Sequence, residues 1–338
     1  METAEVIAPH RVRFSFGRQR FILHGSLFVI TFFTTTLAGV AWRGGDAFEL
    51  ANFPLGLQYS ALLLLFLTAH EMGHFIVARL HNVEATLPYY LPLPGLLFGS
   101  MAGFGTLGAV IRTRSRIPSR RAIFDIGVAG PIAGFIVCCG ILATGFLTLP
   151  SIDYLRAIHP GYPNVQSGGA DLVFGKTLLY GLFEHVFARS GGYVPPMSEM
   201  YHYPLLCVGW FGLFVTSLNL LPVGQLDGGH LIYGLASKRM HRLIGKMTVV
   251  ALLLIALPAA IVSFGDGVIH IPGWLNAVVV PGGETWLLWA LIISLFIRFK
   301  HPETLDETPL DARRTVIAYG TLLIFVLCFT PSPLIVVG

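Results

Sequence analysis

Seven apolar stretches, each close to the roughly 20 residues that a helix needs to cross a bilayer, constrain this chain more than any other feature. They cover about residues 21–42, 57–80, 123–149, 203–221, 243–264, 278–297 and 316–329. Only 12% of the 338 residues are charged, against about 25% in ordinary soluble domains. We therefore predict an all-α polytopic membrane protein with six to seven transmembrane helices. A soluble, disordered or coiled-coil protein is excluded.

Basic residues alternate between the loops and so predict the orientation of the chain. Arginine and lysine gather before the first stretch, between the second and third, between the fourth and fifth, and between the sixth and seventh. The intervening loops carry few such residues. This pattern predicts a cytoplasmic N-terminus. The formal net charge of +4 is too small to indicate a nucleic-acid partner.

The two longest loops differ in character. The loop of residues 150–202, predicted outside, is too short for most independent domains, so residues 1–338 are predicted to form a single membrane-embedded domain with its core at about 57–230. The inner segment Leu87–Ile111 is apolar but broken by prolines and glycines. We interpret Phe98–Ile111 as a Gly-rich β-hairpin that re-enters the bilayer, because irregular backbone at membrane depth must be buried or line a wet cavity. A loop on the membrane surface remains an alternative.

The second stretch contains His70-Glu71-Met72-Gly73-His74, an H-E-x-x-H motif on a predicted helix. The two histidines are four residues apart, so they share one helix face and can bind one metal ion. Zinc lowers the pKa of a bound water towards about 7, and Glu71 is placed to accept its proton. Three ionisable residues in a membrane helix are costly and indicate a functional site.

A catalytic zinc ion usually takes a third protein ligand, and topology points to Asp227. The second and fourth stretches run in the same direction, and the inner end of the fourth carries Asn219-Leu220-Leu221-Pro222-Val223-Gly224-Gln225-Leu226-Asp227-Gly228-Gly229-His230. Asp227 is therefore expected at the depth of the histidines. His230 and Asp125 fit less well, and Glu84, His81 and His24 are expected in water, at the interface or packed. His159, His185, His202 and His270 are expected on the outside, beyond reach.

Two other functions use the same residues. A membrane-anchored protease with a water-facing site would take a downstream glutamate as third ligand, but Glu184, Glu199 and Glu284 are all expected outside. A polytopic metal transporter or channel would use His70, Glu71, His74 and Asp227 as a transit site. Such a transporter would not require the glutamate between the histidines, nor a break after the fourth stretch.

The chain resembles the site-2 protease family of intramembrane zinc metalloproteases. The resemblance rests on HEMGH (His70–His74) and NLLPVGQLDGG (Asn219–Gly229), with support from GFGTLGAVI (Gly103–Ile111) and AGPIAG (Ala129–Gly134). It covers about half of the chain and is closest in style to members without a PDZ domain, including plastid-type homologues.

The resemblance implies one zinc ion on His70, His74 and Asp227, with Glu71 as general base and acid and Asn219 near the scissile carbonyl. It implies membrane-spanning protein substrates, cut within or near their transmembrane segments during regulated intramembrane proteolysis. The substrate strand would bind the hairpin at Gly103, Phe104, Gly105, Thr106, Leu107 and Gly108. The N-terminus is too short and mixed for a transit peptide, which favours a bacterial cytoplasmic membrane. The sequence leaves the oligomeric state open.

Overall fold

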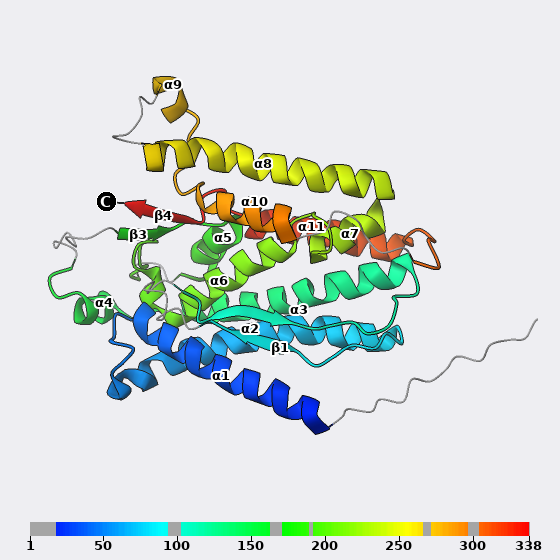
Figure 1. Ribbon diagram of the computed structural model, residues 1–338. Coiled ribbons are helices and arrows are strands. Elements are labelled where there is room, and N and C mark those ends of the chain that lie inside the picture. Colours follow the sequence, from blue (N-terminus) through cyan, green and yellow to red (C-terminus); the bar gives the residue numbers. More distant parts are fainter. Residues whose placement is uncertain are drawn as a thin grey trace, which may run out of the picture.

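The computed structural model describes residues 18–93, 103–162, 171–188, 192–265, 272–296 and 304–337. Within them the chain is mostly helical (Figure 1). The helices are α1 (Arg18–Trp42), η1 (Leu50–Asn52), α2 (Phe53–Leu80), α3 (Arg120–Leu147), α4 (Ile152–Ile158), α5 (Leu178–Phe187), η3 (Met200–His202), α6 (Pro204–Asn219), α7 (Asp227–Leu235), α8 (Lys238–Gly265), α9 (Gly273–Asn276), α10 (Thr285–Phe296) and α11 (Ala312–Cys328). The strands are β1 (Tyr89–Pro92), β2 (Thr106–Val110), β3 (Asp171–Phe174) and β4 (Leu334–Val337).

A helix occupies each of the seven predicted stretches, but the helices differ in length. Four of the described helical segments are long and apolar enough to cross a membrane, namely residues 20–42, 50–80, 120–147 and 238–265. The other three, α6, α10 and α11, have 16, 12 and 17 residues. Helix α10 starts later than predicted because Pro281–Gly283 form a turn in which Gly282 has a φ of +74°. A count of seven spans therefore remains a prediction.

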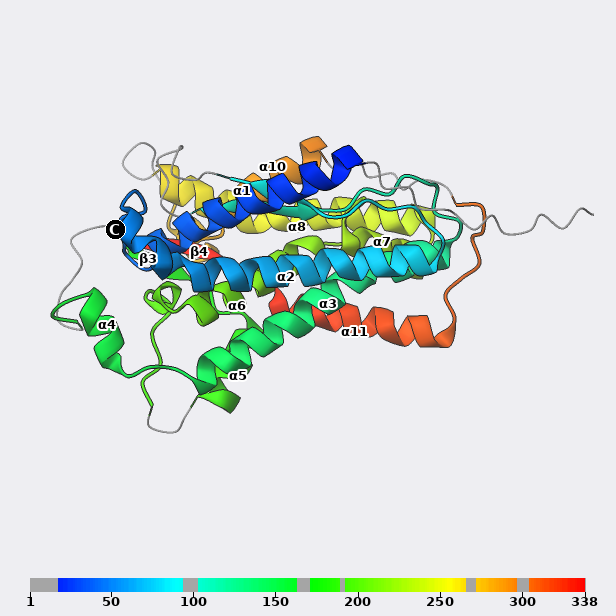
Figure 2. The same cartoon turned by 90° about the horizontal axis from the view of Figure 1, so that it is seen from below.

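Helix α6 lies at the centre of the bundle, packed against α2, α3 and α11 (Figures 1 and 2). Nearly all of its side chains between Leu206 and Leu218 are buried. Small residues bring it close to α3: a Cβ added at Gly209 would lie 2.4 Å from the Leu142 side chain. A short helix is sufficient here because neighbouring helices, and not lipid, cover its apolar side chains.

Strands β1 and β2 lie between α2 and α3 in the sequence and form an antiparallel pair that packs against α1 and α2. Tyr89 pairs with Val110 and Tyr90 with Ala109. The predicted hairpin of residues 98–111 was thus wrong in extent, because its first strand starts at Tyr89. Tertiary contacts explain the difference. Tyr90 Oη lies 2.7 Å from Thr68 Oγ1 of α2, and the Tyr90 ring packs on Phe28 of α1. The segment that connects the strands, residues 94–102, lies outside the described residues.

A second antiparallel pair, which the sequence did not predict, adds to the mostly helical fold. Strand β3, from the loop of residues 150–202, pairs with β4 near the end of the chain, Leu172 opposite Val336. The indole of Trp210 in α6 donates a hydrogen bond to the Gly175 carbonyl just after β3, at 2.7 Å. The two strands are about 160 residues apart in sequence, so local patterns could not predict their pairing.

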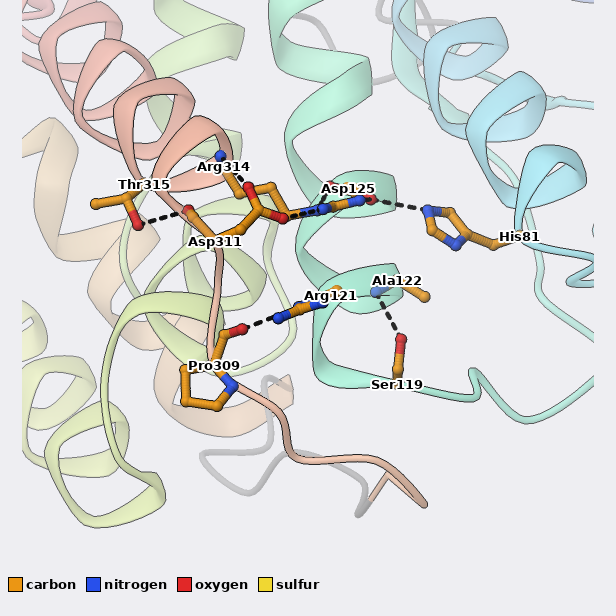
Figure 3. A network of polar contacts seen from close by, with 9 residues as sticks. All are labelled: His81, Ser119, Arg121, Ala122, Asp125, Pro309, Asp311, Arg314 and Thr315. Carbon is orange, nitrogen blue, oxygen red and sulfur yellow. Dashed lines mark hydrogen bonds and ion pairs between the residues drawn. The ribbon is translucent and has the colours of Figure 1, made fainter.

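Two arginines fix the end of α3 that lies nearest α7. Arg120 donates to the carbonyls of Tyr233 and Ala236 at the C-terminal end of α7, at 2.9 and 2.5 Å. Arg314 of α11 makes a two-pronged contact with Asp125 of α3, with N–O distances of 2.8 and 2.7 Å (Figure 3). His81, at the end of α2, lies 2.9 Å from the same Asp125 carboxylate. Asp125 therefore joins three helices, while the N-cap of α3 is Ser119.

Arg314→Leu is expected to lower stability by about 2 kcal/mol, because it leaves the half-buried Asp125 carboxylate with fewer charged hydrogen bonds. The measurement is the apparent melting temperature of the full-length protein in detergent, which should fall by several degrees. Arg313→Leu is the matched control, since Arg313 is exposed on the same turn of α11. Equal melting temperatures for the two variants would show that the Asp125 contact contributes nothing.

Candidate metal centre

His70, His74 and Asp227 come together although about 150 residues separate the histidines from the aspartate. Nε2 of His70 lies 3.2 Å from Nε2 of His74. Asp227 Oδ2 lies 3.3 Å from the first nitrogen and 3.4 Å from the second. Both histidines are buried, at 4% and 7% exposure. The predicted meeting of α2 with the chain segment after α6 is therefore found in the structure.

These distances match one tetrahedral zinc ion. Ligand atoms at about 2.0–2.2 Å from such an ion are about 3.3–3.6 Å from one another, close to the three separations found here. Two imidazoles and one carboxylate are also the ligand types that a catalytic zinc site uses, with a fourth position open. The residues present thus fit a bound zinc ion.

The position of Asp227 depends on the tight turn between α6 and α7. Gly224 in this turn has a φ of +55°. A Cβ at Gly228 would lie 2.0 Å from the Leu220 carbonyl oxygen, and one at Gly229 would lie 2.3 Å from the Gly224 carbonyl oxygen. Glycine is therefore required after Asp227, because the backbone folds directly back on itself. The turn makes Asp227 the first residue of α7.

Helix α3 forms the wall behind the two imidazoles, which the sequence analysis did not anticipate. A Cβ at Gly130 would lie 2.1 Å from His74 Nε2, and one at Gly134 would lie 3.2 Å from His70 Nδ1. His74 Nδ1 lies 2.7 Å from the Ile126 carbonyl oxygen, to which it donates, so Nε2 keeps its lone pair for a metal. The small residues of AGPIAG (Ala129–Gly134) were a visible signal, since this spacing is typical of close helix packing.

Glu71 and Asn219 border the same space. Asn219, the last residue of α6, has its Nδ2 3.3 Å from His70 Nε2. Glu71 is buried at 6% exposure, and it lines the same space as Ile111, the residue that follows β2. Both side chains line a cavity of about 880 Å³ that also contains His70, His74 and Asp227. The cavity provides room for a peptide segment beside the proposed ligands.

The predicted substrate-binding residues lie mainly beside this cavity, not in its wall. Gly105, with a φ of +76°, packs against α1: a Cβ there would lie 2.6 Å from the Thr34 carbonyl oxygen. The Phe104 carbonyl accepts from Tyr59 Oη at 3.2 Å. None of the residues 103–108 is among the lining residues, whereas Ala109, Val110 and Ile111 are. The end of β2 therefore reaches the cavity, and its beginning anchors the strand.

The remaining candidates have other surroundings. His24 packs inside, with Nδ1 3.0 Å from the Pro88 carbonyl oxygen. His230 lines the cavity and lies against α3, where a Cβ at Gly127 would come within 2.4 Å of it. Glu184 pairs with Lys176 at 2.7 Å, and Glu199 lies beside His159 and His202. These two downstream glutamates thus contact groups other than the His70–His74 pair.

Gly130→Ala is expected to weaken zinc retention, because the new methyl group would occupy the place of His74 Nε2. The expected loss of zinc affinity is at least about tenfold, as is usual when a metal ligand loses a contact that orients it. Gly134→Ala should have a smaller effect, since its nearest neighbours are 3.1–3.3 Å away. Gly140→Ala is the control on the same helix, with nothing within 4 Å. The measurement is zinc content after dialysis against a graded chelator series. Equal retention by all three variants would refute the role of α3.

Comparisons with known proteins agree with this arrangement. The profile of peptidase family M50 matches residues 58–262, which include both histidines and Asp227. No solved structure matches the chain.

Among curated proteins, the chain is similar to the probable zinc metalloprotease EGY1, chloroplastic, of Arabidopsis thaliana, with 32% identity over 279 residues, which is 82% of this chain and 43% of that protein. It is 31% identical to the EGY1 of Oryza sativa subsp. japonica over 50% of this chain and 26% of that protein. The EGY2 of Oryza sativa subsp. indica is 25% identical to the chain over 65% of this chain and 37% of that protein. The chain thus spans less than half the length of these relatives. The family profile covers more than half of the chain, and the chain belongs to peptidase family M50, the site-2 protease family.

Proposed function

We propose that this protein is an intramembrane zinc metalloprotease that hydrolyses peptide bonds within or near transmembrane segments of other membrane proteins. The observation that carries the proposal is the convergence of Asp227 with His70 and His74, two histidines that lie inside a helix long and apolar enough to span a bilayer. Membership of family M50 and the names of the EGY relatives support the same activity.

His70, His74 and Asp227 would hold the zinc ion, and Glu71 and Asn219 would act on the substrate. Bound zinc supplies Lewis acidity, which polarises a carbonyl group and makes water more acidic. Glu71 accepts the proton of the attacking water and delivers it to the leaving amide nitrogen. The Asn219 amide, beside His70, donates a hydrogen bond to the carbonyl oxygen as negative charge develops on it.

The substrate is proposed to bind as an added strand along β2. Within the described chain β2 pairs with β1 alone, so its other edge is available for backbone hydrogen bonds. Ala109, Val110 and Ile111 at the end of β2 line the same cavity as Glu71, which would place a scissile bond at the cavity. This shifts the proposed substrate contacts from residues 103–108 towards Ala109–Ile111. An extended strand also exposes a carbonyl that a helix would shield.

The proposed location is within a bilayer, with the N-terminus in the cytoplasm. The four long apolar helices support an integral membrane protein. Re-entry of the hairpin into the bilayer and the count of seven spans are parts of the same proposal. The predicted bacterial cytoplasmic membrane finds no support in the EGY relatives, whose names place them in chloroplasts. A metal transporter, the alternative from the sequence, has no support from the family match.

Glu71→Gln is expected to retain zinc and to lower cleavage by at least about a thousandfold, because the amide can neither accept nor deliver the proton. The assay uses the full-length protein in detergent with a purified single-span membrane reporter that carries helix-breaking residues in its span. Zinc content is measured on the same samples.

Glu84→Gln, beyond the end of α2, is the matched control and should cleave the reporter like the unmodified protein. Undiminished cleavage by zinc-loaded Glu71→Gln would contradict the proposed role of Glu71. Zinc flux into proteoliposomes, together with a complete lack of cleavage by the unmodified protein, would favour the transporter.

A further inference from the structure

A second group of metal-ligating side chains lies at the other end of the bundle. His159 follows α4, Glu199 precedes the single turn of η3, and His202 is the last residue of that turn. Nε2 of His159 lies 2.9 Å from Nε2 of His202. The Glu199 Oε2 atom is 3.5 Å from each of these nitrogens. Three atoms that can bind a metal therefore face one point.

This group has the same composition and similar spacing as the His70–His74–Asp227 centre. Each contains two imidazole nitrogens and one carboxylate oxygen, and in each the ligand atoms lie within 4.8 Å of one another. Among the described residues, no further set of three or more His, Cys, Asp or Glu side chains meets that limit. The two 3.5 Å separations between Glu199 Oε2 and the imidazole nitrogens equal the distance expected between two ligand atoms of one tetrahedral ion. The 2.9 Å separation between the two nitrogens would have to lengthen by a few tenths of an ångström to match it.

The local backbone holds the three side chains in place. Glu199 and His202 are three residues apart in a 3₁₀ turn, where side chains at this spacing lie one above the other. The His202 amide donates to the Glu199 carbonyl at 3.1 Å, and Tyr154 Oη donates to the His202 carbonyl at 2.7 Å. The contact from Tyr154 links α4 to the turn, so it fixes the distance between His159 and His202.

Burial is graded across the group. The His202 side chain is 3% exposed, that of Glu199 is 16% exposed, and that of His159 is 43% exposed. Two ligands are thus anchored in the protein, while the third borders solvent. An ion can enter from the side of His159, and a water molecule can complete its coordination there.

The two groups are separate sites. His202 lies two residues before the start of α6. Asn219, which contacts His70, is the last residue of that helix. A helix of 16 residues is ~24 Å long. Figure 1 shows α4 and α7 towards opposite ends of the bundle.

We propose that His159, Glu199 and His202 bind one divalent first-row transition metal ion of the zinc type. Two imidazoles favour such an ion over calcium or magnesium, which prefer oxygen ligands. The ion would join the end of α4 to the turn that leads into α6, and so close a loop of about 40 residues over this end of the bundle. The role of this ion is structural, and the proposal of a second site does not depend on the proposed protease activity.

The test is the zinc stoichiometry of the full-length protein in detergent, measured by equilibrium dialysis at a fixed, chelator-buffered zinc concentration. The unmodified protein should bind two zinc ions per chain. His159→Gln should bind one, because it removes the most exposed ligand with little disturbance of packing. Glu199→Gln should also lose the second ion. Asp227→Asn should lose the other ion and retain the one proposed here.

His185→Gln is the matched control, since His185 is an exposed histidine in the same loop, and it should still bind two ions. Two zinc ions in His159→Gln, or a single ion in the unmodified protein that His159→Gln retains and Asp227→Asn loses, would overturn the proposal and leave a hydrogen-bonded His–His–Glu group. The apparent melting temperature provides a second measurement: added zinc should raise it more for Asp227→Asn than for the double variant Asp227→Asn/His159→Gln. Equal shifts would also count against the site.

Discussion

The meeting of the Asp227 carboxylate with the His70 and His74 imidazoles is the interaction on which the rest of this structure depends. Ionisable groups inside an apolar helix are costly unless they have partners. The partner here comes from a segment far along the chain, and it must be positioned to within about 0.5 Å of the geometry that a shared ion requires. Helix α6 brings the chain to the right depth, and the Gly-rich turn after it directs Asp227 back towards α2.

Helix α3 acts as the platform that makes this meeting possible. Its glycines leave space where the imidazoles lie, and the Ile126 carbonyl orients His74. Contacts one residue away fix the same helix: Asp125 holds Arg314 of α11 and His81 of α2. Arg120 in turn holds the C-terminal end of α7, the helix that begins at Asp227. Small changes in the position of α3 would therefore reach both sides of the candidate metal centre.

The loop of residues 150–202 is more closely integrated with the bundle than a simple connection would be. Strand β3 pairs with β4, Trp210 of α6 hydrogen-bonds to Gly175, and Tyr154 reaches the His202 carbonyl. These contacts hold the N-terminal end of α6, while the turn after Asn219 holds its C-terminal end. The buried central helix is thus fixed at both ends, which suits an element that positions Asn219 and Asp227.

The sequence by itself determined the helical membrane character, the approximate helix positions, and the choice of His70, His74 and Asp227 as candidate metal ligands. These features follow from local patterns: apolar length, the four-residue spacing of histidines on one helix face, and a Pro/Gly break after α6. Tertiary structure alone decided that β1 begins at Tyr89, that β3 pairs with β4, that Gly130 receives His74, and that His159 meets Glu199 and His202. Each of these depends on contacts between residues distant in sequence, and neither spacing nor hydropathy records which distant surfaces fit together closely enough to pack.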